Sequence, residues 1–325
     1  MVNLSRFSSS LSDSNSDPRI HCRYDRLIKL QAQVEGFSLL PQLKAGSVLS
    51  GRHGSVFRGR GLNFEELRHY QLGDDIRNFD WKVTMRTGKP HVRSYTEEKD
   101  RHVIICVDQR SSMFFSSVEV MKSVVAAEIA ALIGWRVLKD SDRIGMAVCG
   151  CEGINWVKSR RSQADWLQRL QVLTQANQAL NVASHDQVAV SFANLLAMLA
   201  RLKLKNTTLV ILSDWAGATE QDISYLKYLQ RHNDVLGILI ADPLEKSLPC
   251  HSASDSHWVV GDGQFQLNIT NSQQLSRVNQ GLETQLLLKK EQLLKLMAVK
   301  SLPVIELDTS GQHIEQFKRA IAGGR

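Results

Sequence analysis

The sequence predicts an α/β fold, in which a doubly wound, mostly parallel sheet follows a smaller N-terminal segment containing β-strands. From residue 101 onwards, short apolar runs alternate with longer stretches of helical periodicity. Such alternation is typical of βαβ units. The runs are apolar at consecutive positions, which indicates strands covered on both faces. We therefore expect residues 101–325 to form one α/β domain.

The elements of this domain follow from the periodicity, taken in chain order. We predict strands at 102–107, 142–150, 208–213, 235–241 and 304–307, with 155–157 extending or pairing with the second of them. We predict helices at 118–138, 166–173, 192–202, 220–230, 275–299 and 314–322. Residues 257–269, with Gly261-Asp262-Gly263 at the centre, are expected to form an inserted hairpin.

The residues before this domain differ in composition. Residues 1–20 are rich in Ser, Asn and Asp and predict a disordered tail. Residues 24–44 show helical spacing up to Pro41, and residues 45–100 are dense in Gly, Arg and Asp. We therefore predict that residues 21–100 form a separate segment with one helix and some β-structure.

Composition favours an ordinary water-soluble protein. The chain has 325 residues, 43% of them hydrophobic, a formal charge of +7 and a pI near 9.2. No apolar run is long enough to span a bilayer, since residues 124–138 are interrupted by Glu128 and Arg136. The N-terminus has no signal-peptide pattern, and the five cysteines are scattered rather than spaced as a disulfide framework. We expect a cytoplasmic bacterial protein without membrane insertion.

Two predicted strands each end on an aspartate. Asp108 closes the first strand and Asp214 follows the third. In an open α/β sheet, ligands bind outside the carboxyl ends of the strands, so both carboxylates are expected at one edge. Ser112 lies on the turn into the first helix, and Ser191 lies at the start of the helix at 192–202; both could add hydroxyl oxygens around Mg²⁺. The alternative is that each aspartate caps a helix or turn.

Arg110 complicates this candidate metal site, because a guanidinium is a cation without an acceptor. It could fold back towards Asp108 and Asp214 and take the place of the metal charge. It could also point to solvent beside a working site. The sequence leaves both arrangements open.

A second cluster of charged residues precedes the sheet. Asp74, Asp75 and Asp80 lie among arginines and aromatic residues. We favour an internal network, with Arg68 and Arg77 pairing with Glu65, Asp74 or Asp80 while Tyr70, Phe79 and Trp81 pack. The alternative is a metal-dependent hydrolase that uses the three aspartates, which would have to converge in a cleft open to water.

The Gly-rich run from Gly51 to Gly61 lacks the Gly-Lys-Ser/Thr ending of a phosphate-binding loop, so we predict no nucleotide site there. Its arginines, Arg52, Arg58 and Arg60, could contact nucleic acid, but no aromatic stacking ladder accompanies them. We do not expect a nucleic-acid partner.

Several motifs together resemble one protein family, the domain of unknown function 58 family. In the first part of the chain they are Gly59-Arg60-Gly61, Phe64-Glu65, Arg68-x-Tyr70, Gly73-Asp74-Asp75-x-Arg77, Asp80-Trp81, Thr84, Arg86 and Gly88. Further along they are Asp108-x-x-x-Ser112-Met113, Ser213-Asp214, Asp242-Pro243-Leu244-Glu245 and Leu248-Pro249. The resemblance covers roughly residues 24 to 323.

The resemblance implies a von Willebrand factor A-like, Rossmann-type domain with a metal-ion-dependent adhesion site. The first loop of such a site reads Asp-x-Ser-x-Ser, and its metal keeps an open position for an acidic residue of a partner. The site residues would be Asp108, Arg110, Ser112, Ser191 and Asp214, with Arg110 replacing the first serine. The family-signature network would comprise Glu65, Arg68, Tyr70, Asp74, Asp75, Arg77, Asp80, Trp81 and Arg86.

The implied role is non-enzymatic. Members of the family that this sequence resembles are usually encoded beside MoxR-type AAA+ ATPases, together with other von Willebrand factor A-like proteins. The resemblance therefore implies an adaptor or co-chaperone of such an ATPase. We therefore expect a protein-interaction module with these partners, no catalytic residues and no small-molecule substrate, and with Mg²⁺ as its only candidate cofactor.

Overall fold

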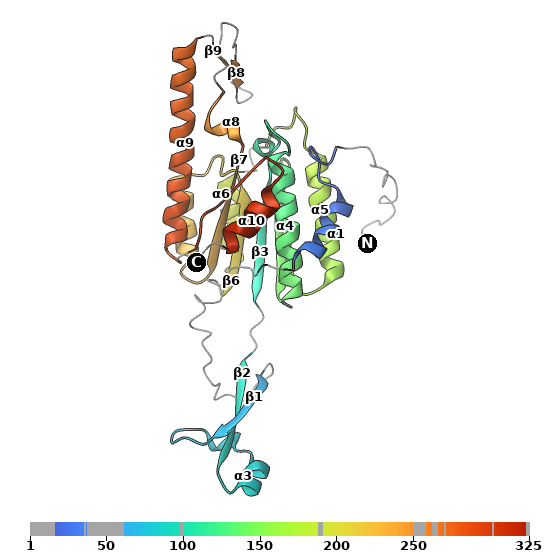
Figure 1. The fold of residues 1–325 in the computed structure, drawn as a ribbon, viewed down its shortest axis with the longest axis vertical. Helices are drawn as coiled ribbons and strands as arrows, with labels where there is room; N and C mark the ends of the chain where they lie inside the picture. Colours follow the sequence, from blue (N-terminus) through green and yellow to red (C-terminus); the bar gives the residue numbers. More distant parts are fainter. Residues whose placement is uncertain are drawn as a thin grey trace. The chain divides into compact units, whose positions relative to one another are not determined.

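The computed structural model describes residues 17–35, 37, 62–97, 101–187, 191–249, 258–261, 266–269, 271–300 and 302–322. The chain divides into two compact units (Figure 1). Unit 1 combines Met1–Leu40 with His102–Arg325, and unit 2 is Pro41–Arg101.

Unit 1 is built on a six-stranded sheet whose strand order is β10-β7-β6-β3-β4-β5. The strands are β3 (His102–Gln109), β4 (Arg143–Gly150), β5 (Gly153–Arg160), β6 (Thr207–Ser213), β7 (Asp234–Ala241) and β10 (Ile305–Asp308). Only the β4–β5 pair is antiparallel; β5 returns beside β4 through a tight turn. The predicted α/β class, with a doubly wound and mostly parallel sheet, is confirmed.

Helices cover both faces of this sheet (Figure 1). One face carries α1 (Tyr24–Lys29), α4 (Lys122–Lys139), α5 (Gln163–Gln178) and α10 (His313–Ala322). The other carries α6 (Phe192–Arg201), α7 (Glu220–Leu229) and α9 (Ser272–Ala298). The strands between them are buried almost throughout, as their apolar runs require.

Helix α4 is the centre of the packing. Almost all of its residues are buried, because it packs on the sheet and also contacts α1, α5 and α10. At Gly134 the indole ring of Trp166 from α5 takes the space that a Cβ would occupy. Trp166 itself is completely buried. The glycine therefore allows α4 and α5 to approach closely.

The N-terminal helix belongs to unit 1 rather than to the segment that precedes the sheet, which corrects our predicted boundary at residue 21. Helix α1 continues as the 3₁₀ turn η1 (Leu30–Gln33) and packs on α4 and α5. Leu27 is fully buried, and the indole Nε1 of Trp135 donates to its carbonyl oxygen at 2.9 Å. Residues 17–20 of the predicted tail form a turn, with Met121 N–H bonded to Arg19 O; residues 1–16 lie outside the described ranges.

Several element ends differ from the predicted ones. Helix α4 begins at Lys122, not at residue 118, because residues 114–121 form a loop after the short 3₁₀ turn η4 (Ser111–Met113). Helix α5 begins earlier than predicted, where the Ser162 hydroxyl caps it by accepting from Asp165 N–H. The predicted hairpin is present as β8 (Trp258–Gly261) and β9 (Gln266–Ile269), following the short helix α8 (Pro243–Lys246).

Unit 2 is an antiparallel hairpin of β1 (Leu62–His69) and β2 (His91–Glu97). The connection between them contains the 3₁₀ turn η3 (Ile76–Asn78) and the short helix α3 (Trp81–Thr87). Helix α3 ends at Gly88, whose φ of 69° lies in the left-handed region that favours glycine. Among the helices in the described ranges, none combines the length and apolar character needed to cross a bilayer.

Candidate functional site

The carboxyl edge of the sheet in unit 1 gathers aspartates. Asp108 is the last residue but one of β3, Asp214 and Asp242 directly follow β6 and β7, and Asp308 ends β10. The register pairs Val107 with Leu212, which places Asp108 beside Ser213 and one residue from Asp214 along the neighbouring strand. The two aspartates of the predicted site therefore lie at the same edge of the sheet.

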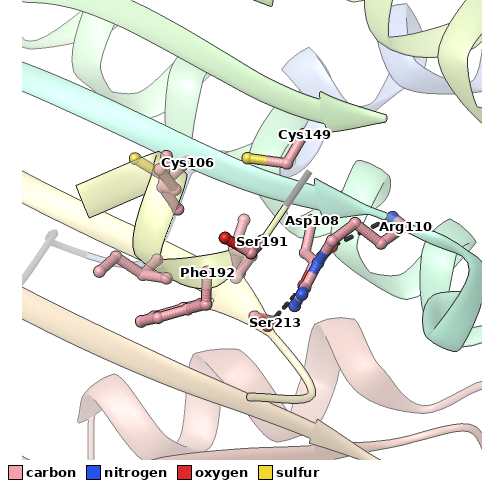
Figure 2. Close-up of a pocket in the computed structure, with 10 residues that line it drawn as sticks. Cys106, Asp108, Arg110, Cys149, Ser191, Phe192 and Ser213 are labelled. Atoms are coloured by element: carbon pink, nitrogen blue, oxygen red, sulfur yellow. Dashed lines mark hydrogen bonds and ion pairs between the residues drawn. The ribbon is translucent and has the colours of Figure 1, made fainter. Parts of the chain in front are cut away.

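Arg110 folds back onto Asp108 (Figure 2). Its Nε lies 3.0 Å from one carboxylate oxygen and its Nη2 lies 2.7 Å from the other. The Ser213 hydroxyl donates to the second oxygen at 2.6 Å. Both charged side chains are buried, so this is a bidentate ion pair shielded from water.

The backbone after β6 closes over the guanidinium. Arg110 Nη2 also donates to the carbonyl oxygen of Ala216 at 3.2 Å. Burial by itself would lower the pKa of Arg110, but the hydrogen bonds and charge of Asp108 outweigh it and raise that pKa. Of the two arrangements that the sequence left open, the structure shows the one in which Arg110 turns inward, although its direct partner is Asp108 and not Asp214.

Asp214 has a different cation, Lys122. Lys122 Nζ lies 3.0 Å from Asp214 and 2.5 Å from Glu245 at the start of α8. Burial favours neutral forms of both groups, but their mutual attraction lowers the pKa of Asp214 and raises the pKa of Lys122. Asp214 also accepts from Ala216 N–H at 2.9 Å, which is the turn-capping role considered as an alternative.

Lys122 and Glu245 were not among the site residues that we inferred from the sequence. Glu245 appeared only within the motif Asp242-Pro243-Leu244-Glu245. Lys122 had a usable signal, because it opens a helix that is otherwise almost wholly apolar and whose residues become buried. A lysine in such a place needs a carboxylate partner.

The two predicted serine ligands have separate roles. Ser191 is the N-cap of α6, where its hydroxyl accepts from Asn194 N–H. It also lines a small pocket with Asp108 and Arg110 (Figure 2). Ser112 lies in η4, and its hydroxyl is buried without a hydrogen-bond partner in the described residues.

These side chains, as arranged, do not fit Mg²⁺. Both oxygens of Asp108 already accept hydrogen bonds from Arg110, and Lys122 neutralises Asp214. Ser112 Oγ is a single orphaned hydroxyl, which is too little to hold a cation that prefers six oxygen ligands. No group of three His, Cys, Asp or Glu side chains suitable for a metal occurs in the described part of the chain.

Asp242 serves to hold the loop beside the site. It accepts from the backbone and hydroxyl of Ser117 at 2.8 and 2.5 Å, and from Thr309 Oγ1 at 2.6 Å. Burial alone would raise the pKa of Asp242, but these hydrogen bonds lower it. The loop therefore has a fixed backbone, and it exposes two apolar side chains, Phe115 (41%) and Val118 (56%), to solvent.

The thiols near this edge are poor nucleophiles. Burial raises the pKa of Cys106 to about 12 and raises that of Cys149 well above its ordinary value. Burial and the nearby charge of Asp186 raise the pKa of Cys151 to about 12. Since the thiolate is the reactive form, these groups stay protonated near neutral pH.

The charged cluster of unit 2 is a set of structural contacts, though not with all the predicted partners. Arg68 forms a fork on Asp74, with distances of 2.8 and 2.5 Å, as predicted. Asp80 pairs with Arg93 of β2 at 2.7 Å instead of with Arg77, and it caps α3 at Val83 N–H. These contacts lower the pKa of Asp80.

Arg77 and Trp81 depart from the predicted network. Arg77 contacts Asp75 only through its backbone N–H, at 2.9 Å, and its side chain is exposed. The rings of Tyr70, Phe79 and Trp81 form a consecutive series with centroids 5.2 Å apart, but Trp81 remains 62% exposed. Arg86 is exposed in the last turn of α3, and the side chain of Glu65 lies outside what the structure describes.

These contacts do not favour the hydrolase alternative. Asp74 is engaged by Arg68, whose hydrogen bonds lower the pKa of that carboxyl. Asp75 caps η3, and Asp80 is engaged by Arg93. Each carboxylate thus has a separate structural partner. The predicted nucleic-acid contacts at Arg52, Arg58 and Arg60 lie outside the described residues.

Three comparisons relate this chain to known proteins. It is 28% identical over 222 residues to uncharacterized proteins of Mycobacterium tuberculosis (Rv1480) and Mycobacterium bovis (Mb1516), covering 68% of this chain and 68% of each relative.

Among solved structures, it is similar to the conserved hypothetical protein BatB from Bacteroides thetaiotaomicron, with a TM-score of 0.41, 11% identity, and coverage of 69% of this chain and 98% of that one. It is also similar to a von Willebrand factor type A protein from Catenulispora acidiphila, with a TM-score of 0.30, 14% identity, and coverage of 46% and 35%. These structural likenesses are too distant to carry an inference about the site.

The family comparison covers more than half of the sequence. The model described as "Protein of unknown function DUF58" matches residues 66–278, which include the cluster of unit 2, both buried ion pairs at the sheet edge and α8. The chain therefore belongs to the DUF58 family.

Proposed function

We propose that this chain is a protein-interaction module whose partner binds at the carboxyl edge of the sheet. We call this surface the docking edge and define it by the buried pairs Asp108–Arg110 and Asp214–Lys122 and by the exposed residues Phe115 and Val118. The proposal is based on the combination of buried ion pairs and exposed apolar residues at this edge. Two buried ion pairs lie at the strand ends, and the loop that Asp242 holds presents apolar side chains to solvent.

Such a surface has the composition of a protein interface. Interfaces are centred on apolar and aromatic anchors, with buried polar groups that set orientation. Phe115 is an aromatic anchor of this kind, and Lys122 Nζ lies 5.7 Å from its ring centroid. The backbone of the loop is held by Asp242. A partner would therefore meet a preorganised surface, which reduces the entropic cost of binding.

The chemistry of the edge also supports a non-enzymatic role. Its thiols have raised pKa values, and in the described residues of this edge no histidine is hydrogen-bonded to a serine or a cysteine. Such a pair commonly activates a serine or cysteine nucleophile. We accordingly assign no catalytic residue and no small-molecule substrate.

The partner we propose is a MoxR-type AAA+ ATPase, assisted by other von Willebrand factor A-like proteins, with this chain as a cytoplasmic adaptor or co-chaperone. This choice follows from the family resemblance of the motifs. The contacts described above support the docking edge as the proposed interface, and the ATPase is the partner with which we propose to test it.

The test is binding of the purified chain to the MoxR-type ATPase of the same organism. Val118→Asp and Phe115→Ala change side chains that are 56% and 41% exposed, and circular dichroism should show that both variants are folded. Each is expected to weaken binding at least tenfold, about 1.4 kcal/mol. Val182→Asp is the matched control, since Val182 is 94% exposed on a different loop. Equal affinities for Val118→Asp, Val182→Asp and the wild type would contradict the proposal.

A further inference from the structure

We infer that Arg110 occupies the position of the divalent cation in an adhesion-type site, so that the docking edge works without metal and offers a guanidinium to a carboxylate of the partner. The metal-free character follows from the contacts of Arg110 alone. The partner's carboxylate rests in addition on the proposed function, because it requires a protein to bind at this edge.

Both oxygens of the Asp108 carboxylate are already occupied by hydrogen-bond donors of the chain. One of its oxygens accepts from the backbone N–H and the Nε of Arg110, at 3.1 and 3.0 Å. The other accepts from Arg110 Nη2 and from the Ser213 hydroxyl, at 2.7 and 2.6 Å. Each oxygen therefore already has two donors, which is the usual capacity of a carboxylate oxygen. A metal could reach Asp108 only by displacing Arg110.

The negative charges at this edge are already balanced by two cationic side chains. Arg110 cancels Asp108, and the single charge of Lys122 is shared between Asp214 and Glu245. A cation of charge two placed among these groups would lie close to two buried positive side chains. Repulsion between buried charges is only weakly screened. The edge is thus neutralised by groups that belong to the chain itself.

One N–H-bearing group of Arg110 remains without an acceptor in the part of the chain that the structure describes. A guanidinium has five N–H groups. Nε and Nη2 of Arg110 bond to Asp108, and Nη2 bonds also to Ala216 O. Among the residues that the structure describes, Nη1 has no acceptor. The Arg110 side chain is 8% exposed, and Nη1 is not among the fully buried unpaired atoms, so this group can donate to an oxygen brought by a partner. The planar guanidinium is well suited to a carboxylate.

An arginine in the place of a metal ion has a functional consequence. A site that holds a metal ion loses its partner when the metal is chelated. A site in which an arginine provides the charge keeps its affinity in chelator. Such a site also requires a guanidinium, since lysine supplies the charge but cannot donate two parallel hydrogen bonds to a carboxylate.

The first experiment measures Mn²⁺ binding by electron paramagnetic resonance and calorimetry. We expect no saturable binding by the wild type or by Arg110→Lys. Arg110→Ser introduces a hydroxyl ligand and frees Asp108, and it should show saturable binding of one Mn²⁺. Arg201→Ser, which removes an exposed arginine from α6, is the charge-matched control and should behave as the wild type. Saturable binding by the wild type, or no gain in a folded Arg110→Ser protein, would overturn the inference.

The second experiment measures affinity for the nucleotide-free ATPase in EDTA and in Mg²⁺. We expect equal wild-type affinities in both buffers and a loss of at least tenfold for Arg110→Lys. A chelator-sensitive wild type would overturn the metal-free edge. If Val118→Asp weakens binding but Arg110→Lys does not, the carboxylate contact is wrong while the proposed function stands. If neither variant weakens binding, the proposed function fails and the Mn²⁺ result still decides whether Arg110 replaces the metal.

Discussion

Lys122 is the first residue of helix α4, and its Nζ lies between Asp214 and Glu245 at 3.0 and 2.5 Å. Only 2% of the Lys122 side chain is exposed. A cation at a helix N-terminus faces the positive end of the helix dipole, so the helix itself disfavours this position. The two carboxylates must therefore compensate both for the dipole and for the loss of water.

Removing the lysine should reveal how much the fold depends on this pair. Lys122→Met leaves Asp214 buried without a cation, which typically costs about 3–5 kcal/mol. We expect that loss in the free energy of unfolding, measured by urea denaturation at pH 7. Lys139→Met is the control, since its ion pair with Glu35 is exposed and should contribute less than about 1 kcal/mol.

A double variant separates loss of charge balance from loss of packing. Lys122→Met combined with Asp214→Asn removes both charges, and it should be more stable than Lys122→Met alone. If the double variant is the less stable of the two, burial of an unpaired carboxylate does not explain the cost of Lys122→Met.

The same residues show how far the sequence could predict the site. Asp108 and Asp214 were predictable, because strand ends in a parallel sheet meet at one edge whatever the loops do. The partners of Lys122 could not be predicted from the sequence. Asp214 and Glu245 come next to it only because α4 packs against the strand ends. Local spacing contains no information of that kind.

In unit 2, too, contacts between residues distant in sequence could not be predicted. Arg68 and Asp74 are close in sequence, and their pairing was predicted correctly. The partner of Asp80 was predicted wrongly as Arg77 or Arg68, because Arg93 becomes its neighbour only when residues 79–80 pair with the start of β2. The fold class, in contrast, depends on repeated periodicity over many residues, so single errors of this kind do not affect it.

A second buried acid gives a prediction about pH. Glu128 in α4 accepts from His313 Nε2 at 2.9 Å and from Arg26 at 3.1 Å. Burial alone would raise the pKa of Glu128, but these partners hold it below the ordinary value of 4.5. Its ionised form therefore stabilises the fold above pH 4.5, and this contribution disappears as the pH falls through the lower pKa of the folded state.

We accordingly expect Glu128→Gln to cost about 1–3 kcal/mol at pH 7, since it weakens hydrogen bonds to a charged group. Urea denaturation at several pH values should show the difference from wild type shrinking below pH 4.5. Glu315→Gln is the control, because Glu315 on α10 is mostly exposed. A Glu128→Gln deficit that stays constant down to pH 3 would contradict the assignment.

Two glycines in helix interiors should respond in opposite directions to alanine. At Gly134 a Cβ would overlap the buried Trp166 ring, and overpacking of this kind costs about 1–3 kcal/mol. At Gly281 in α9 a Cβ would meet nothing within 4 Å. Alanine there should stabilise the protein by about 0.5–1 kcal/mol through helix propensity. Thermal unfolding of the two variants checks both signs, and stabilisation by Gly134→Ala would mean that α4 and α5 are not in close contact.

The thiols provide a test of the docking edge as a non-catalytic site. Burial raises the pKa of Cys22 and Cys106 to about 12, and that of Cys149 well above 9.0. At pH 8 a thiol of pKa 12 is ionised to about one part in 10⁴, against about a tenth for a thiol of the ordinary pKa of 9.0. Alkylation by iodoacetamide, followed residue by residue by mass spectrometry, should be at least 100-fold slower at these three positions in the native protein than in denaturant. Rapid native labelling of Cys149 would instead place a thiolate beside Asp108 and Arg110, and the edge would then have to be reconsidered as a site of covalent chemistry.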